Sequence, residues 1–247
     1  MMNTRTLFPK FVLVRAQFRA QFRAQIIALL IAQVIVFSQM AQAQTAPGPE
    51  EISSYTGLHL AAFDGNINDA RALIKDNADI EARDSAGRTP VIIAAFASHE
   101  DMVELLAGAG ADLNAFDNQA YDVVTIAAVA DDFPMLDRVL ELGANAGNVT
   151  SPYEGTALIA AAHLGHHKVV DRLLEAGAPV DHINNLQWTA LIEAVVLGDG
   201  GPDHTETVRL LLQADADKTI GDSNGVTPLQ HAMNRGYEEM VKLLKAR

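Results

Sequence analysis

The heptapeptide TPVIIAA, residues 89–95, decides the fold because related heptapeptides recur along the chain at a nearly constant spacing. The recurrences are TGLHLAA from Thr56, DVVTIAA from Asp122, TALIAAA from Thr156, TALIEAV from Thr189 and TPLQHAM from Thr227. Successive heptapeptides begin 33, 33, 34, 33 and 38 residues apart. Self-similarity at such a period is typical of a protein built from stacked structural repeats.

A second landmark, a short motif of the Gly-Ala-Asp type, keeps the same period. It occurs as NAD from Asn77, GAD from Gly110, GAN from Gly143, GAP from Gly177 and DAD from Asp215. Between the landmarks, units carry apolar residues at positions i, i+3 and i+4, for example Val170, Leu173 and Leu174. This spacing places the apolar side chains on one face of a helix.

Each unit is therefore predicted to contain two helices and a projecting turn. The threonine that opens the heptapeptide acts as a helix N-cap, and the proline at Pro90 and Pro228 stands where a helix loses no hydrogen bond. The alanine pair lets neighbouring helices approach closely, and the Gly-Ala landmark closes the second helix with a left-handed cap. Because one unit cannot cover its own apolar face, the units must stack into a solenoid with a continuous core.

This pattern resembles the ankyrin repeat family, and the resemblance covers residues 55–247. It implies an all-α fold, an ankyrin repeat solenoid of about six helix-turn-helix units with projecting turns, whose repeats start near residues 56, 89, 122, 156, 189 and 227. The third unit has Asp122 as its capping residue, and aspartate also caps helices. The fourth turn, in GNVTSPYEG, has one extra residue, and the fifth unit has a five-residue insertion in GDGGPDHTE.

Residues 1–43 are expected to form a cleavable secretory signal peptide. They contain five basic and no acidic residues, and the apolar run IIALLIAQVIVF precedes SQMAQAQ. Ala41 and Ala43 provide the small-x-small pattern of a signal peptidase site, so we expect cleavage between Ala43 and Gln44. The apolar run is shorter than the roughly 20 residues that span a bilayer, which argues against stable membrane insertion. The alternative is a membrane tether formed by an uncleaved N-terminal segment.

The segment that follows cleavage, residues 44–54, is rich in proline, glycine and acidic residues and is predicted to be a flexible linker. The expected location of the mature protein is the periplasm. Residues 44–247 contain 13 basic and 31 acidic residues, a formal charge of −18. Such a charge repels nucleic acid and favours a partner protein with a basic patch. The absence of cysteine excludes disulfides, thiolate metal sites and cysteine nucleophiles.

No recognisable catalytic motif is present, so we expect no enzymatic activity and no cofactor. SHEDMV lacks the second histidine of a zinc protease helix, and neither a Gly-x-Ser-x-Gly elbow nor a phosphate-binding loop occurs. His163, His166 and His167 lie close together in the sequence, but Gly165 breaks the helix between them and the repeat register gives them separate positions. The alternative function is binding of a small ligand or metal ion by the loop 199–206, which contains Asp199, Asp203, His204 and Glu206.

The resemblance implies that a partner binds the turn tips and the exposed face of the first helices, which together line a groove. The residues that match these positions are Arg88, Asn118, Tyr121, Tyr153 and Trp188 at the tips and Phe63, Phe96 and His163 on the first helices. Aromatic and arginine side chains on a rigid scaffold are the usual anchors of protein interfaces. The sequence therefore predicts an exported, non-enzymatic protein–protein interaction module with no bound metal.

Overall fold

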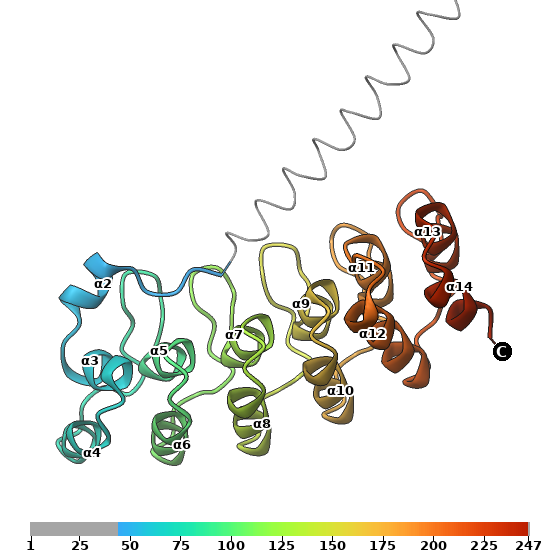
Figure 1. Ribbon diagram of the computed structural model, residues 1–247. Coiled ribbons are helices and arrows are strands. Elements are labelled where there is room, and N and C mark those ends of the chain that lie inside the picture. Colours follow the sequence, from blue (N-terminus) through green and yellow to red (C-terminus); the bar gives the residue numbers. More distant parts are fainter. Residues whose placement is uncertain (1–43, 247) are drawn as a thin grey trace, which may run out of the picture. The chain divides into compact units, whose positions relative to one another are not determined.

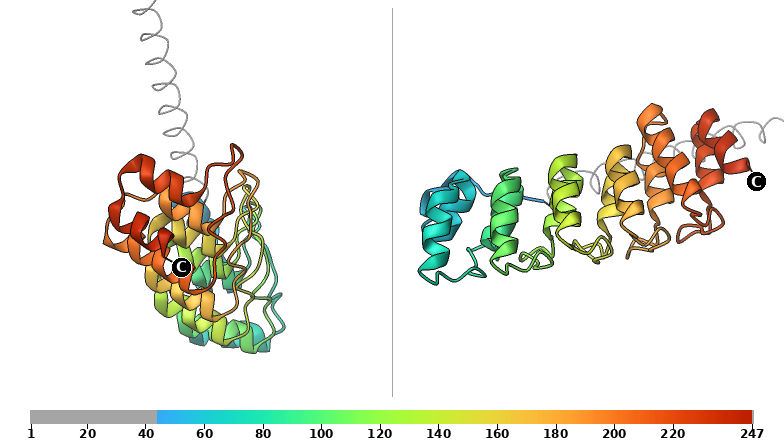
Figure 2. Two further views of the ribbon diagram at one scale, coloured as in Figure 1. Left: turned by 90° about the vertical axis from the view of Figure 1, so that its right-hand side faces the viewer. Right: turned by 90° about the horizontal axis from the view of Figure 1, so that it is seen from below.

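The computed structural model describes residues 44–246, and this part of the chain consists of helices joined by turns. The first helices of the units are α3 (Gly57–Asp64), α5 (Pro90–Phe96), α7 (Val123–Val129), α9 (Ala157–Leu164), α11 (Ala190–Val196) and α13 (Pro228–Arg235). The second helices are α4 (Ile67–Lys75), α6 (Glu100–Gly108), α8 (Phe133–Glu141), α10 (His167–Glu175), α12 (Pro202–Gln213) and α14 (Glu238–Lys245). Figure 1 shows these pairs side by side in chain order, with the first helices in one layer and the second helices in another, and Figure 2 shows the turns projecting on the same side of the row. The structure thus confirms the predicted all-α solenoid.

The first helices begin where the repeat pattern placed them, one residue after each capping position. The side-chain oxygens of Thr156, Thr189 and Thr227 accept the backbone N–H three residues later. Asp122 does the same with the N–H of Thr125, at 2.8 Å. Thr56 and Thr89 also stand at the N-cap position, but their hydroxyls make no capping bond. At α3 the extended backbone of the cap residue marks the start, and at α5 Pro90 at the first helical position does so as well.

The core lies between the two layers and continues from unit to unit. The alanine pairs are buried in the first four units, at residues 61–62, 94–95, 127–128 and 161–162. Val170 and Leu173 of the predicted apolar triplet are fully buried on α10, and the equivalent residues of α6, α8 and α12 are buried in the same way. Small residues on the first helices and branched residues on the second therefore allow close stacking along the whole row.

The segment 44–54, predicted to be a flexible linker, contains a short helix, α2 (Pro49–Ser54). Proline opens this helix, and the side chain of Glu51 accepts the backbone N–H of Gly48 at 2.8 Å, which favours helix over linker. No residue of α2 is buried. Gln44 is the first described residue, so Ala43 and the rest of the predicted signal peptide lie outside the described range. In residues 44–246 no helix has the length and apolar character needed to cross a membrane.

Candidate interaction surface

The projecting turns owe their shape to an aspartate or asparagine five residues before the capping position. The side-chain oxygen Oδ1 of Asp84 accepts the backbone N–H groups of Ala86 and Arg88, at 2.9 and 2.8 Å. Asp117, Asn184 and Asp222 make the equivalent pairs of bonds in their own turns. The turn with the extra residue instead closes through a backbone bridge between Thr150 and Gly155. Four tips are therefore held in one shape by their own side chains, and the tip with the extra residue by its backbone bridge.

Neighbouring tips are also bonded to each other. Asn118 donates its backbone N–H to the carbonyl of Ala86 at 2.9 Å and its amide to Ser85 at 3.2 Å. Asn185 bonds to Tyr153 and Pro152 in the same manner. The close approach requires glycine at Gly87, whose φ is +77° and where an added Cβ would lie 2.3 Å from Asn118 Oδ1. Asn118 is exposed as predicted, but much of its bonding capacity joins two tips.

Two of the predicted tip anchors are buried, so the expectation that they are exposed is wrong. Arg88 is only 1% exposed because its guanidinium bonds to Asp84 and to the N-terminal segment. Tyr121 is 4% exposed, and this burial raises its pKa to about 12, with the charges of Asp117 and Tyr153 acting in the same direction. Tyr153 and Trp188 are partly exposed. Of the predicted tip residues, Asn118, Tyr153 and Trp188 thus remain accessible.

The predicted residues of the first helices, Phe63, Phe96 and His163, are all partly exposed. His163 Nδ1 lies 3.2 Å from Oε2 of Glu193, whose side chain is fully buried. The other oxygen of Glu193 accepts the amide of Asn184 at 3.1 Å. A carboxylate thus connects α9 with α11 and with the turn before α11. Sequence reasoning missed Glu193, although it breaks the apolar pattern of its heptapeptide.

Exposed apolar side chains gather on the turns and first helices. Among the described residues, Phe116, Val149 and Ile183 are 38%, 49% and 43% exposed, and each directly precedes the residue that closes its turn. We call these three residues the turn stripe. Leu60, Leu164 and Met233 are similarly exposed on α3, α9 and α13. Exposed apolar groups on a structurally fixed surface indicate a binding site for another molecule.

His166 and His167 take the separate positions that the repeat register predicts, and His204 makes a contact like that of His166. His166 Nδ1 contacts the carbonyl of Ala128 at 3.0 Å, and His204 Nε2 contacts the carbonyl of His163 at the same distance. These contacts join each unit to the one before it. His167 faces Asp203, with 3.5 Å between Nδ1 and Oδ1. The three neighbouring histidines therefore serve different contacts.

Residues 199–206, predicted as a loop and as the alternative ligand site, do not form one loop, because residues 202–206 belong to the start of α12. Their side chains make contacts within the protein. Asp199 faces His204 and accepts the N–H of Gly201, and Glu206 pairs with Arg209. The hydroxyl of Tyr237 also donates to the carbonyl of Gly198 at 3.0 Å. Across residues 44–246, no group of three or more potential ligands is placed to hold a metal ion. The geometry thus gives the inserted loop a packing role between units.

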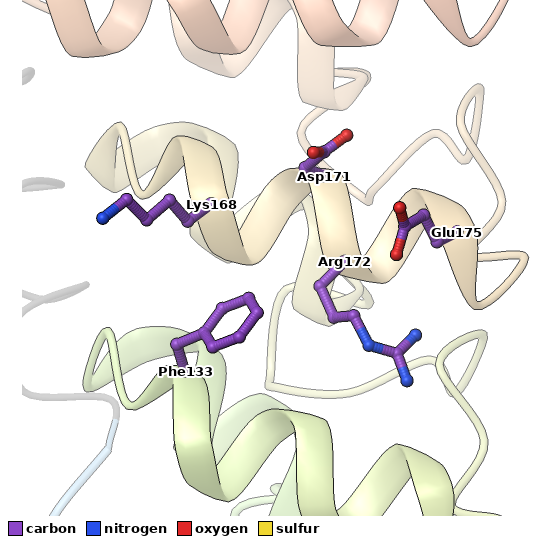
Figure 3. A pocket seen from close by; sticks show the side chains of 5 residues that line it. All are labelled: Phe133, Lys168, Asp171, Arg172 and Glu175. Carbon is purple, nitrogen blue, oxygen red and sulfur yellow. The ribbon is translucent and has the colours of Figure 1, made fainter.

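A shallow pocket of about 440 Å³ lies between the second helices α8 and α10 (Figure 3). Its lining consists of Phe133, Lys168, Asp171, Arg172 and Glu175. Arg172 is engaged by Asp137, with 2.7 Å between Nε and Oδ1. The lining thus combines charges of both signs around one aromatic ring, without a nucleophile and base in contact, and it does not include the turn stripe.

A row of helix pairs with bonded turns defines a solenoid repeat protein that presents an extended surface. The chain belongs to the ankyrin repeat family. A family model described as ankyrin repeats in three copies matches residues 22–117 and 124–222, and a model of a single ankyrin repeat matches residues 224–247. Ankyrin repeat proteins are protein–protein interaction modules, and their fold is a non-enzymatic interaction fold.

Relatives of similar length support this assignment. The ankyrin repeat protein YahD of Escherichia coli strain K12 is 34% identical over 188 residues, which is 76% of this chain and 93% of YahD. The crystal structure of an ankyrin repeat domain from Acinetobacter baumannii AYE is 41% identical, with a TM-score of 0.72 over 76% of this chain and 95% of that one. A chain in the complex of a predatory endopeptidase from Bdellovibrio bacteriovorus with an immunity protein is 23% identical, with a TM-score of 0.65, and shares the fold. It is matched over 97% of its length and 77% of this chain.

Proposed function

We propose that this protein is an exported, non-enzymatic interaction module that binds a partner protein across its turn tips and first helices. The observation that carries the proposal is the turn stripe: Phe116, Val149 and Ile183 are exposed on three successive turns whose backbones are fixed by hydrogen bonds. A surface held in its binding conformation loses little entropy on association, so exposed apolar area contributes efficiently to affinity. Tyr153 and Trp188 provide aromatic groups on the same turns.

Charge gives this surface a preference among partners. The 31 acidic residues all lie outside residues 1–43, and only 13 basic residues accompany them. A partner with an apolar centre and a basic rim would gain in association rate from this field. We therefore propose a partner protein with a basic patch. The proposed function requires no bound nucleic acid, metal or cofactor.

A capture experiment tests the interaction surface. The chain from Gln44 serves as bait in a periplasmic extract, alongside the triple variant F116S/V149S/I183S and the control F133S. Phe133 is as exposed as Phe116 but lies on α8, away from the turns. We expect at least one protein to be recovered with the wild type and with F133S and to be lost from the triple variant. Equal recovery with all three baits would contradict binding through the turn stripe.

Export is tested separately, by the mass of the protein recovered from the periplasm. The basic opening, the apolar run and the Ala41-x-Ala43 ending support cleavage before Gln44. We expect a periplasmic species that begins at Gln44, and retention of the precursor when both alanines are changed to aspartate. A full-length species in the membrane fraction would instead support the uncleaved tether.

A further inference from the structure

The guanidinium of Arg88, on the turn that precedes α5 (the first turn), donates a hydrogen bond from each of its three nitrogens. Its side chain is 2% exposed, Nε donates to Asp84 Oδ2 at 2.8 Å, Nη1 donates to the carbonyl of Thr45 at 3.2 Å, and Nη2 donates to Glu51. Tyr55 donates its hydroxyl to the same oxygen of Asp84 at 2.8 Å. A buried guanidinium keeps its charge and therefore needs such acceptors.

The acceptors come from two different parts of the chain. Asp84 belongs to the turn itself, where its other oxygen holds the backbone N–H groups of Ala86 and Arg88. Although burial alone would raise its pKa, the bonds from Arg88 and Tyr55 keep the pKa of Asp84 below its ordinary value. Asp84 thus orients the guanidinium through Nε. The acceptors of Nη1 and Nη2 come from the N-terminal segment.

The polar contacts with Arg88 join the N-terminal segment to the first turn. Helix α2 has no buried residue, Thr45 is exposed, and the Glu51 side chain is 32% exposed. Apolar burial therefore contributes little to its position. If the segment moved away, Nη1 and Nη2 of an already oriented guanidinium would be open, and such a pair of donors matches the two oxygens of a carboxylate.

We propose that residues 45–54 form a displaceable strap over a carboxylate-binding subsite centred on Arg88, and that a short acidic segment of the partner, separate from its basic patch, takes the place of this strap. The strap shows what the subsite accepts: a non-helical Thr-Ala-Pro-Gly stretch in which the carbonyl of Thr45 accepts from Nη1, followed by Glu51, which accepts from Nη2. This inference deepens the proposed function and rests on it, because strap release would add the first turn to the interaction surface.

Tethering explains why the strap occupies the subsite in the intact chain. A covalently linked ligand acts at an effective concentration in the millimolar range, so a free peptide of the same sequence competes poorly. A separate peptide should therefore bind at the Arg88 subsite only when the strap is weakened. Glu51 is the residue to change, and its neighbour Glu50 is a matched control, since Glu50 is exposed and is not bonded to Arg88.

The first arm of the test measures hydrogen exchange by mass spectrometry in the full chain and its E51A and E50A variants. In E51A, we expect the backbone N–H groups of Ile52 and Tyr55, which close α2, to exchange at least tenfold faster than in the wild type. In E50A their exchange should be unchanged. Equal exchange in the two variants would overturn the proposal that Arg88 holds the strap.

The second arm tests the subsite with a labelled synthetic peptide of residues 45–54, TAPGPEEISS, and with TAPGPEAISS, in which the second glutamate is alanine. Binding of the first peptide to E51A should be at least tenfold tighter than its binding to the wild type and than the binding of TAPGPEAISS to E51A. If E51A loosens α2 only by losing the Glu51 cap on Gly48, it will bind both peptides equally, and the carboxylate subsite is refuted. Neither arm uses the unknown partner, so failure of the capture experiment leaves this result independent.

Discussion

At the scale of single residues, one position of the repeat takes on different roles in different units. The fifth residue counted from the capping position is Ile93 or Ile126 in two units, where it is fully buried core, and Glu193 in another. Glu193 keeps the burial but gains His163 and Asn184 as partners. His163, predicted as a binding residue, thus has part of its ring committed to this cluster. Buried polar groups bonded in this way favour one register of neighbouring units over others.

Asp122 makes a residue-scale prediction about pH. Burial raises the pKa of this carboxyl, and the bonds from Thr125 and Asn148 only partly offset the shift. An acid whose pKa is raised on folding contributes most to stability below its unfolded pKa of about 3.9, and this contribution declines as pH rises through the raised value. Asp122→Thr retains a capping residue and removes the buried charge. The measured quantity is the free energy of unfolding of the variant minus that of the wild type. We expect this difference to be more positive at pH 7 than at pH 4.

Urea unfolding of both proteins at the two pH values measures this difference. The control is Asp64→Thr, which changes an exposed aspartate at the end of α3. The same pH dependence in both variants would show that removal of any acidic residue, rather than of a buried one, produces the effect.

At the scale of elements, the helices were predictable and the accessibility of the turns was not. Threonine, proline and the alanine pair are local signals, so the first helices start where the heptapeptides placed them. Exposure of a tip residue depends instead on which segment covers it. Tyr121 sits at a tip and is buried, whereas Phe116, five residues earlier, is exposed. The aspartate or asparagine five residues before the capping position recurs in four of the turns, so the sequence does carry a signal for their shape.

The inserted loop carries a prediction that separates close packing from backbone strain. Gly200 has φ +75°, and an added Cβ would lie 2.4 Å from the ring of Tyr237, whereas Gly225 has φ +73° and open space around the same position. Both substitutions by alanine incur the left-handed penalty of about 1–2 kcal/mol. Gly200→Ala should cost about 1–3 kcal/mol more, because the ring must move.

Chemical denaturation of G200A and G225A tests this difference directly. Equal losses in the free energy of unfolding would mean that Tyr237 moves away without cost. The inserted loop would then not pack rigidly between the last two units, contrary to the bond between Tyr237 and Gly198.

At the scale of the whole molecule, the solenoid followed from the period alone, but the contact between α2 and the first turn did not. Stacking is a nearest-neighbour property, so six similar units predict their own arrangement. The pairing of Arg88 with Glu51 joins residues 37 positions apart and lies outside the repeat. Nothing in the period indicates it, and for that reason Arg88 was predicted as an exposed anchor and residues 44–54 as a linker.

The charge of the whole molecule gives the last prediction. Residues 44–247 have a formal charge of −18, and such an excess destabilises a compact state by self-repulsion. Raising NaCl from 10 to 150 mM shortens the screening length from about 30 to about 8 Å, which removes most of this repulsion. Exposed pairs such as Lys242 with Glu239 weaken as well, but they contribute little.

We therefore expect the free energy of unfolding and the Tm to rise with salt, by about 2–4 °C for each 1 kcal/mol gained. The variant D64N/D101N/E175Q, with three exposed acidic residues neutralised, should show a smaller rise. A Tm that falls with salt would mean that specific ion pairs, with Arg88 foremost, outweigh the net repulsion.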